Sequence, residues 1–494
     1  MIAPQSRMSA LRHWPVTTRD RLPLALWDAD TLATVLEGTA SGPFQVSGVE
    51  IDSRDVRSGD LFFALNGEST DGHKFLDKAF AAGAAAAVVD RPVDYPHILV
   101  ADTTRALEAL GQAATARCSA VRIGVTGSVG KTGVKEAIFA ALDRTSRGQA
   151  HRSVRSYNNH VGVPLSLSRM PVRSEFGVFE MGMNHAGEIA HLTAQVRPNI
   201  ALITTIAPAH IENLGSMEAI VDAKAEIFAG LEAGGIAVIP ADTPYFERLR
   251  DHALRAGAKV ISFGAAAHAD VRLLDAIPSA NGGSLVTADL GTTRMCYSVA
   301  EPGEHWIANS LAVMAAVRAA GGDLGAAGLA LAEMGGLKGR GARHQIAAPG
   351  GKALLIDESY NANPASMRAT LRSLGQTPAT RRVAVLGSMK ELGDFAPKFH
   401  EQLAEPLAEA NVDFAILVGE EMRALALHLG KGGGHALGKG LSFAHCDGPA
   451  EAITALEEFG ITAGDAILVK GSNSIGLGRL VTRFVDQQIG GREG

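Results

Sequence analysis

The stretch VTGSVGKTGVKE, Val125–Glu136, places a glycine-rich turn between an apolar segment and a segment with helical spacing. The backbone N–H groups of such a turn and the positive end of the following helix favour phosphate binding. The usual nucleotide loop has four residues between its first glycine and its Gly-Lys-Thr. Here only Ser128 and Val129 separate Gly127 from Gly130. The stretch therefore predicts a nucleotide site at the end of a strand, built on a shortened loop, and leaves the reaction open.

Composition bounds the class of protein. A length of 494 residues predicts about three domains. The chain contains 46% hydrophobic and 20% charged residues, a composition typical of globular domains with large cores. The net charge of -6 argues against a nucleic-acid-binding face, so an anionic ligand must be met by local positive groups. The widely spaced Cys118, Cys296 and Cys446 indicate a reducing compartment, with neither a disulfide framework nor a zinc knuckle.

No apolar run reaches membrane-spanning length, and the first residues lack the continuous apolar core of a signal peptide. We therefore expect a cytoplasmic protein that is not embedded in a membrane. We also expect a loose N-terminal extension over residues 1–25, in which Met8 is an alternative start.

Strand and helix patterns predict an α/β fold with three domains. Residues 1–118 predict a small α/β domain, with two strands around a turn at 58–60 and a helix ending near Gly83. Residues 119–337 alternate buried strands with helices, which predicts a central parallel-sheet domain resembling P-loop ATPases. The alternation restarts over 338–494 and predicts a Rossmann-like domain. The glycine-rich, basic stretch 336–345 between them predicts a hinge.

Polar residues follow two of the central strands. Glu180 ends FGVFE, and His210 follows ALITTIAPA. Ligands of open α/β sheets bind beyond the carboxyl ends of strands, where Glu180 could hold Mg²⁺ or merely cap a turn. Mg²⁺ prefers oxygen ligands, so His210 taken alone is more typical of a hydrogen-bonded structural histidine.

The shortened loop TGSVGKT resembles the phosphate loop of the Mur ligases, the ATP-dependent amide-forming enzymes of peptidoglycan precursor synthesis. The resemblance continues, in order, through nearly the whole chain from about residue 45. It is carried by SYNNHVGVPLSLSRM (156–170), FEMGMNHAGEIAHL (179–192), APAHIENLGSMEAIVDAKAEIF (207–228), GEHWIANSLAVMAAV (303–317) and DESYNANPASM (357–367). The last stretch is similar to that of the family members that add a dipeptide to a UDP-linked tripeptide.

The resemblance implies the reaction and its small-molecule substrates. D-alanyl-D-alanine would be joined to UDP-N-acetylmuramoyl-tripeptide through an acyl phosphate, giving the UDP-linked pentapeptide, ADP and phosphate. It also implies ATP, two Mg²⁺ ions, a carbamylated Lys224 and a monomer. The third peptide residue, lysine or diaminopimelate, stays open.

Residue roles are likewise implied by the resemblance. The ATP phosphates would be wrapped by Thr126, Gly127, Ser128, Val129, Gly130, Lys131 and Thr132, with further nucleotide contacts from Asn309 (base), Arg340 (phosphate) and Asp357 (ribose). The catalytic residues would be Lys131, Lys224, His210 and Glu180, and the Mg²⁺ ligands would be Thr132, Glu180, His210 and Lys224. Substrate would be bound by Ser53, Arg54 and His73 at the UDP end, Asn158 and Asn159 along the peptide, and Tyr360, Asn361 and Asn363 at the dipeptide.

Three positions depart from the family pattern. Trp306 stands where Asn is usual, Gly133 where Ser or Thr is frequent, and Asn473 where Arg is common. They bear on the adenine contacts and on closure of the last domain.

Two other functions are compatible with the short loop. A folylpolyglutamate synthetase or the ligase that adds the third amino acid shares it, but DESYNANP argues against both. The absence of an Asp-Asn-Pro-Arg motif argues further against the ligase that adds the third amino acid. The UDP-type N-terminal domain also argues against the folate enzyme. A non-catalytic nucleotide switch would normally carry Asn-Lys-x-Asp, which does not occur here.

Overall fold

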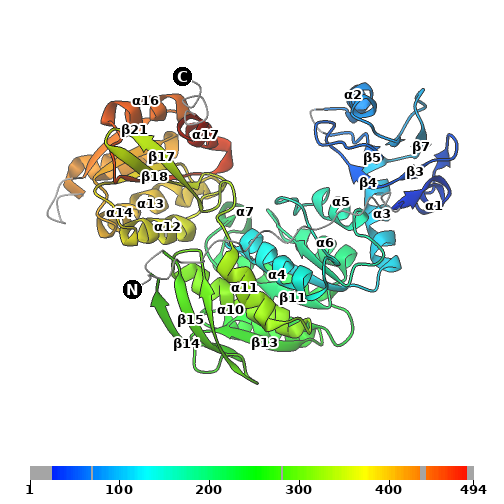
Figure 1. Ribbon diagram of the computed structural model, residues 1–494, viewed down its shortest axis with the longest axis horizontal. Helices are drawn as coiled ribbons and strands as arrows, with labels where there is room; N and C mark the ends of the chain where they lie inside the picture. The colour runs from blue at the N-terminus through cyan, green and yellow to red at the C-terminus, as the bar shows by residue number, and fades with distance from the viewer. Residues whose placement is uncertain (1–24, 68–69, 280–281, 434–440, 487–494) are drawn as a thin grey trace, which may run out of the picture. The chain divides into compact units, whose positions relative to one another are not determined.

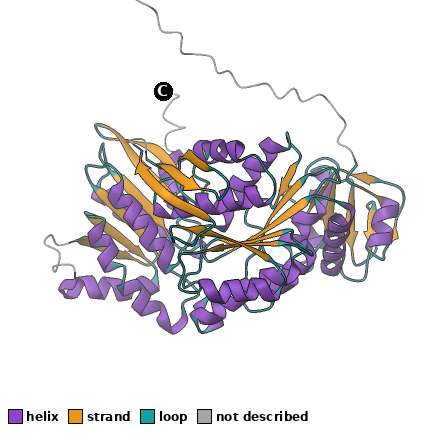
Figure 2. Ribbon diagram, turned by 90° about the horizontal axis from the view of Figure 1, so that it is seen from below, coloured by secondary structure: helices purple, strands orange, loops and turns teal. Residues whose placement is uncertain are grey.

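The computed structural model describes residues 25–67, 70–279, 282–433 and 441–486. The predicted N-terminal extension therefore lies outside the described residues, apart from residue 25. The chain divides into two compact units, Met1–Ala106 and Leu107–Gly494. Figures 1 and 2 show mixed α/β structure, which confirms the predicted fold class, while the three domain boundaries stay a prediction. No helix in the described ranges is both long and apolar enough to cross a bilayer.

The N-terminal unit is built on a five-stranded sheet in the order β2-β7-β6-β5-β4. Its β4 and β5 run parallel, so the two predicted strands around residues 58–60 do not form a hairpin. The predicted helix is α2, and Phe62, Leu76 and Val89 belong to the core beneath it. The elements are β1 (Trp27–Asp28), α1 (Ala29–Val35), β2 (Thr39–Ala40), β3 (Gln45–Val46), β4 (Gly48–Glu50), β5 (Asp60–Phe63), η1 (Gly72–Phe75), α2 (Leu76–Ala81), β6 (Ala86–Val89) and β7 (His97–Leu99).

The second unit contains a nine-stranded sheet in the order β16-β15-β14-β13-β12-β11-β8-β10-β9. From β9 to β14 neighbouring strands are parallel, as predicted, whereas β14, β15 and β16 pair antiparallel. This extension was not predicted, because its strands are only partly buried and lack the apolar runs of the central strands. The strands are β8 (Val121–Thr126), β9 (Ala150–Arg152), β10 (Phe176–Glu180), β11 (Ile200–Ile203), β12 (Ile236–Pro240), β13 (Lys259–Gly264), β14 (Val271–Pro278), β15 (Ser284–Asp289) and β16 (Arg294–Val299).

Helices cover both faces of this sheet (Figure 2). Helix α4 buries Val134, Ile138 and Leu142, spaced one turn apart, against the core that α10 and α11 share. On the other face α6 and α8 contribute Ile189 and Ile220. The helices are α3 (Thr103–Arg117), α4 (Lys131–Thr145), α5 (Gly162–Ser168), α6 (Glu188–Val196), α7 (Ile211–Leu214), α8 (Met217–Ala225), η2 (Glu226–Gly230), α9 (Phe246–Arg255), α10 (Glu304–Ala319) and α11 (Leu324–Glu333).

A six-stranded sheet, β17-β18-β22-β19-β20-β21, follows in the same unit. Its strands are parallel except β17, which pairs antiparallel with β18 along its full length. The predicted hinge is thereby shortened, because Ala342 already pairs with Asp357 and β17 begins there. The elements are β17 (Ala342–Ala348), β18 (Gly351–Glu358), α12 (Pro364–Gln376), β19 (Arg382–Gly387), η3 (Gly393–Phe395), α13 (Ala396–Glu401), α14 (Ala404–Glu409), β20 (Phe414–Val418), η4 (Glu420–Met422), α15 (Arg423–His428), η5 (Leu429–Gly433), β21 (Ser442–Cys446), α16 (Pro449–Phe459), β22 (Ala466–Lys470), η7 (Asn473–Ile475) and α17 (Gly478–Asp486).

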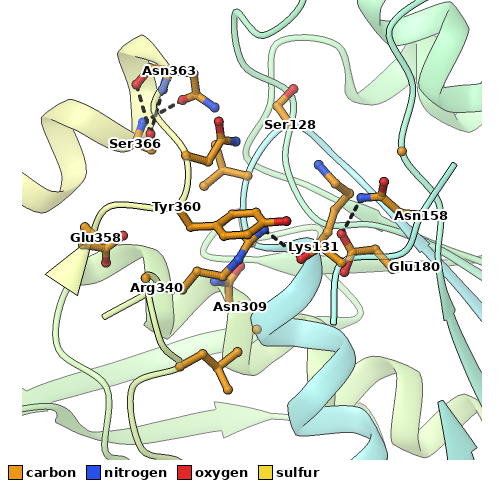
Figure 3. Close-up of a pocket in the computed structure, with 18 of the residues that line it drawn as sticks. Ser128, Lys131, Asn158, Glu180, Asn309, Arg340, Glu358, Tyr360, Asn363 and Ser366 are labelled. Atoms are coloured by element: carbon orange, nitrogen blue, oxygen red, sulfur yellow. Dashed lines mark hydrogen bonds between the residues drawn. The ribbon is translucent and has the colours of Figure 1, made fainter. Parts of the chain in front are cut away.

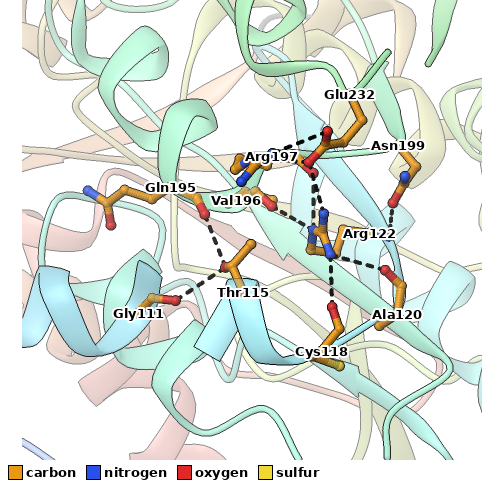
Figure 4. Close-up of polar contacts among 10 residues, drawn as sticks. All are labelled: Gly111, Thr115, Cys118, Ala120, Arg122, Gln195, Val196, Arg197, Asn199 and Glu232. Atoms are coloured by element: carbon orange, nitrogen blue, oxygen red, sulfur yellow. Dashed lines mark hydrogen bonds and ion pairs between the residues drawn. The ribbon is translucent and has the colours of Figure 1, made fainter. Parts of the chain in front are cut away.

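A buried arginine fixes the start of the central strand β8 (Figure 4). The Nε atom of Arg122 donates to the carbonyls of Val196 at 2.8 Å and Arg197 at 3.0 Å. Its Nη1 atom donates to the carbonyls of Cys118 and Ala120, each at 3.3 Å. The guanidinium thus joins the end of α3, the start of β8 and the end of α6 at the edge of the sheet opposite the glycine loop.

Candidate active site

The glycine loop lies where the predicted sheet topology places it, at the carboxyl end of β8 and between the neighbours β10 and β11. Gly127 has a φ of +143°, and a Cβ there would lie 2.0 Å from Thr204 Oγ1, so only glycine fits. The Ser128 hydroxyl donates to the Ala207 carbonyl at 2.8 Å. Lys131 begins α4, and its Nζ atom donates to the Gly127 carbonyl at 2.6 Å. The loop is therefore held open by its neighbours, with the lysine folded over it.

Glu180 ends β10 beside the start of α4 and is completely buried. One carboxylate oxygen accepts from the Thr132 hydroxyl at 2.9 Å. The other accepts from Asn158 Nδ2 at 2.8 Å (Figure 3). The Thr132 hydroxyl also lies 3.3 Å from Ser156 Oγ. A buried carboxylate and a hydroxyl thus share one position next to the phosphate loop, and both are oxygen ligands of the kind that Mg²⁺ takes.

Lys224, on α8, is 2% exposed and lines the same cavity as Lys131. Its ammonium has neither a hydrogen bond nor an ion pair with any residue that the structure describes. Burial, and then the nearby charge of Lys131, hold the pKa of Lys224 well below its ordinary value. The pKa of Lys131 is also lowered, mainly by burial, with Glu180 acting in the opposite direction. Burial without an anionic partner among the described residues thus favours the neutral amine of Lys224 over the ammonium.

His210 follows β11 in the left-handed conformation, with a φ of +59°, and also lines the cavity. Its Nδ1 atom pairs with the carboxylate of Glu391, which belongs to the segment before η3. The hydrogen bond from His210 holds the pKa of Glu391 below its ordinary value. The histidine thus links the strand-end loop of the first sheet to the second α/β half of this unit.

The hinge arginine reaches back to the phosphate loop. Arg340 Nη2 donates to Ser156 Oγ at 3.0 Å, and its guanidinium lies over the ring of Tyr360 at 4.2 Å (Figure 3). The carboxylate of Asp357 accepts from the Gly339 N–H at 2.8 Å and from the Ser359 hydroxyl at 2.6 Å. Asp357 therefore fixes the backbone beside Arg340 and does not line the cavity.

These groups enclose one cavity of about 370 Å³. Most predicted site residues of this unit line it: Ser128, Val129, Gly130, Lys131, Asn158, Asn159, Glu180, His210, Lys224, Asn309, Arg340, Tyr360, Asn361 and Asn363. Thr126, Gly127, Thr132 and Asp357 lie behind its wall. Asn363 also caps α12 through a reciprocal pair of hydrogen bonds with Ser366, so part of its role is structural.

Sequence reasoning missed several charged and polar lining residues. Glu358 lines the cavity next to the predicted Asp357, and burial raises its pKa while Lys470 and Arg340 lower it. Lys470 is 2% exposed and donates to the Asn361 carbonyl at 2.8 Å. Both residues end neighbouring parallel strands, β18 and β22, so the rule that sites lie at carboxyl ends of strands could have found them.

The three predicted UDP-end residues lie in the N-terminal unit. Ser53 is buried, and Arg54 is paired with Asp52 and largely exposed. The imidazole of His73 lies between two carboxylates, with Nδ1 2.8 Å from Asp71 and Nε2 3.2 Å from Asp90. His73 therefore has a local structural role that its sequence context did not reveal.

The residues present fit a triphosphate and a hard cation. In the described ranges, no group of three or more His, Cys, Asp or Glu side chains gathers in a way that could hold a metal ion unaided. The Thr132–Glu180 pair supplies two oxygens beside the loop, and phosphate oxygens would complete such a site. Lys224, elsewhere on the wall of the same cavity, is suited as a Mg²⁺ ligand only if its amine is converted to an anion.

Comparison with known proteins agrees with this geometry. Three family models match in succession: the Mur ligase family catalytic domain over residues 45–137, the Mur ligase middle domain over 125–317, and the Mur ligase glutamate ligase domain over 342–473. A protein of Synechocystis, UDP-N-acetylmuramoyl-tripeptide–D-alanyl-D-alanine ligase, is 35% identical over 90% of this chain and 93% of its own length. The chain belongs to the Mur ligase family.

Solved Mur ligase structures share the fold. The crystal structure of MurF from Acinetobacter baumannii matches with a TM-score of 0.79 and 29% identity, over 93% of this chain and 99% of that one. MurF from Thermotoga maritima, solved in complex with ADP, matches with a TM-score of 0.72 and 26% identity, over 90% and 98% of the two chains. The resemblance inferred from the sequence is thereby confirmed, together with the three-domain architecture of the family.

Proposed function

We propose that this chain is the ATP-dependent ligase that joins D-alanyl-D-alanine to UDP-N-acetylmuramoyl-tripeptide in peptidoglycan precursor synthesis. The observation that carries the proposal is the single cavity in which the phosphate loop faces Tyr360, Asn361 and Asn363 of the DESYNANP segment. Relatives named for this same activity match over most of the chain, and they favour this reaction over the folate enzyme and over a nucleotide switch.

The first chemical step is transfer of a phosphoryl group. A carboxylate is a poor electrophile, so an oxygen of the tripeptide's terminal carboxylate attacks the γ-phosphorus of ATP, and the bond to ADP breaks. Lys131 and Arg340 stand beside the loop, where they neutralise the oxygens that crowd together during transfer. This step needs no side-chain nucleophile, because the chain contributes position and charge.

The second step forms the amide. The amine of D-alanyl-D-alanine attacks the carbonyl carbon of the acyl phosphate, phosphate leaves from the tetrahedral intermediate, and the nitrogen releases a proton. The DESYNANP segment and Lys470 form the wall from which this amine would approach. Closure of the last α/β half about the shortened hinge would exclude water from the acyl phosphate. The contact of Arg340 with Ser156 supports such a closed arrangement.

Thr132 and Glu180 would hold one Mg²⁺, which supplies Lewis-acid stabilisation of phosphate charge when it is bound. Lys224 and His210 would serve a second ion. The neutral amine of Lys224 is the form that reacts with CO₂: the nitrogen bonds to the carbon of CO₂ and releases a proton, and the resulting carbamate is an anion with two oxygens. The lowered pKa of Lys224 supports this modification.

The proposal also covers the UDP end of the substrate, the ribose side of the nucleotide, the compartment and the oligomeric state. Ser53, Arg54 and His73 belong to the unit that would hold the UDP end of the substrate. Asp357, which fixes the Gly339 backbone and adjoins the cavity-lining Glu358, would serve the ribose side of the nucleotide. We place the enzyme in the cytoplasm, where ATP and UDP-linked precursors are available, and we propose that it acts as a monomer.

The test is release of ADP by the purified protein with Mg²⁺, UDP-N-acetylmuramoyl-tripeptide and D-alanyl-D-alanine. We expect release only when both substrates are present, and loss of release in Lys131→Ala. Single amino acids replace the dipeptide in a matched reaction. Release with a single amino acid on a shorter acceptor, and none with the dipeptide, would assign the chain to a different reaction of the family.

A further inference from the structure

Trp306 lies in the first turn of α10, and its half-buried indole forms part of the cavity wall. The same side chain separates the main cavity from a small adjoining one of about 20 Å³. Glu301, His305 and Glu358 line both spaces as well. A flat aromatic surface is therefore exposed among polar groups, in a cavity whose other end is the phosphate loop.

Gly133 explains how the indole reaches this position. A Cβ at Gly133 would lie 2.7 Å from Cη2 and 3.0 Å from Cζ2 of Trp306. Gly133 stands in helix α4 with an ordinary helical backbone, so no left-handed conformation requires glycine there. Glycine is a poor helix former, and its value at this position is the space that it leaves. The indole can thus lie directly against the backbone of the helix that begins at the phosphate loop.

Asn309 stands one helical turn after Trp306, on the same side of α10. Its amide faces the loop itself, because a Cβ at Gly130 would lie 2.8 Å from Asn309 Oδ1. Helix α10 thus presents an amide to the phosphate loop and an aromatic ring to the first turn of α4. The phosphates of a nucleotide fill the loop end, so its base must occupy another part of the same cavity wall.

We propose that Trp306 positions the adenine base of ATP by stacking on it, and that Gly133 is required to give the indole room. The inference rests on the proposed function, because it takes ATP as the nucleotide. An aromatic face gives a base strong contact without hydrogen bonds, and stacking of this kind tolerates different bases. The half-buried His305 next to it has a pKa lowered to about 4, by desolvation and then by the charge of Lys470, so it adds no charge against the base at neutral pH.

Equilibrium binding of two probes to the full chain separates base contact from phosphate contact. ATP carries the base, and inorganic tripolyphosphate carries only the phosphates. We expect Trp306→Ala to weaken ATP binding by roughly 5- to 100-fold, the range of a lost base–aromatic stack. Tripolyphosphate binding should stay within about twofold, and Trp306→Phe, which keeps an aromatic face, should retain most of the ATP affinity.

A double-mutant cycle tests the role of Gly133. Gly133→Ala should strengthen the helix and yet weaken ATP binding, because the methyl group displaces the indole. In the Trp306→Ala background the same change should have no further effect on ATP binding, since the displaced ring is already gone. Independent, additive losses from the two changes would overturn the coupling.

The outcomes distinguish this inference from the proposed function. Equal loss of ATP and tripolyphosphate binding in Trp306→Ala and in Trp306→Phe would mean that the ring only supports the loop, and would overturn stacking alone. Unchanged ATP binding in Trp306→Ala would overturn it too, while substrate-dependent ADP release would still uphold the ligase. A wild-type chain that binds tripolyphosphate and not ATP would overturn both.

Discussion

Replacing Arg122 by Met should lower the stability of the Leu107–Gly494 unit and leave its chemistry intact. The change keeps the apolar stem of the side chain and removes the donors to four backbone carbonyls at the base of the sheet. Arg122 is only 8% exposed, so in the variant water can reach few of the carbonyls that have lost their donor. The phosphate loop begins at the other end of β8, which at ~3.3 Å per residue is more than ten ångströms away.

The magnitude follows from the contacts. The Nε hydrogen is shared by two carbonyls at 2.8 and 3.0 Å, and the two Nη1 bonds are longer, at 3.3 Å. Burial lowers the pKa of Arg122, so desolvation of the guanidinium offsets part of the stability that these hydrogen bonds contribute. Counting the network as three bonds of ~1 kcal/mol each gives a net loss of about 3 kcal/mol. For a unit of this size, with an unfolding entropy of about 0.8 kcal/mol/K, that is a fall in Tm of roughly 4 °C.

The assay is thermal unfolding, combined with ADP release well below the transition. Arg197→Met is the matched control. Arg122 Nη2 lies 3.3 Å from Glu232 Oε1, and Arg197 pairs with the same carboxylate. The Arg197 side chain is 58% exposed, so its loss should cost less than about 1 kcal/mol. A Tm unchanged by Arg122→Met would show that the network contributes no stability. A fall in kcat for the folded variant at low temperature would show that the base of the sheet is coupled to the site.

Three changes in the site follow. Glu180→Gln keeps a partner for the Thr132 hydroxyl but removes the charge, so the fold should survive while Mg²⁺-dependent nucleotide binding and ADP release fall roughly 100-fold or more; near-normal binding would refute the ligand role. Lys224→Met should abolish ADP release and raise Tm in CO₂-free buffer. The pKa of Lys224 is lowered in the folded chain, so a charged Lys224 destabilises the fold. This destabilisation is fully present below the folded pKa and disappears as the pH rises past about 10.4, the pKa of the unfolded lysine. Bicarbonate should stabilise the wild type only, and equal stabilisation of both proteins would count against carbamylation. Asn363→Ala removes the reciprocal cap with Ser366, so it should cost about 1 kcal/mol and raise KM for the dipeptide but not for ATP; KM values that move together would argue against the local role.

The sequence correctly predicted those parts of the fold and the site that a local sequence pattern determines. The buried strands β8, β10 and β11 read as continuous apolar runs, and the glycine loop between β8 and α4 has to follow a strand and open a helix. Parallel pairing then brings Glu180 to the loop without further information. For that reason most predicted residues of this unit meet in one cavity.

It failed where the outcome depended on which way a side chain points. Asp357 and Glu358 are adjacent acids at the end of β18, and successive side chains of a strand point to opposite faces. Only the structure shows that Glu358 faces the cavity while Asp357 holds Gly339. The closeness of Trp306 to Gly133 likewise joins residues far apart in the chain, through the packing of two helices that no local pattern specifies.

The electrostatics of the cavity connect its two proposed ligands. Lys224 is buried and Lys131 half-buried in this cavity. The charge of Lys131 helps to lower the pKa of Lys224, and the charge of Arg340 lowers the pKa of Lys131. A triphosphate in the loop supplies the negative charge that Lys131 lacks. A carbamate removes the repulsion from Lys224 outright and turns it into an attraction for Lys131 and for a cation. Each event therefore favours the charged state of Lys131 on which transfer depends. On the proposed function, bicarbonate should tighten nucleotide binding, and by reciprocity nucleotide should increase occupancy of the carbamate by the same factor.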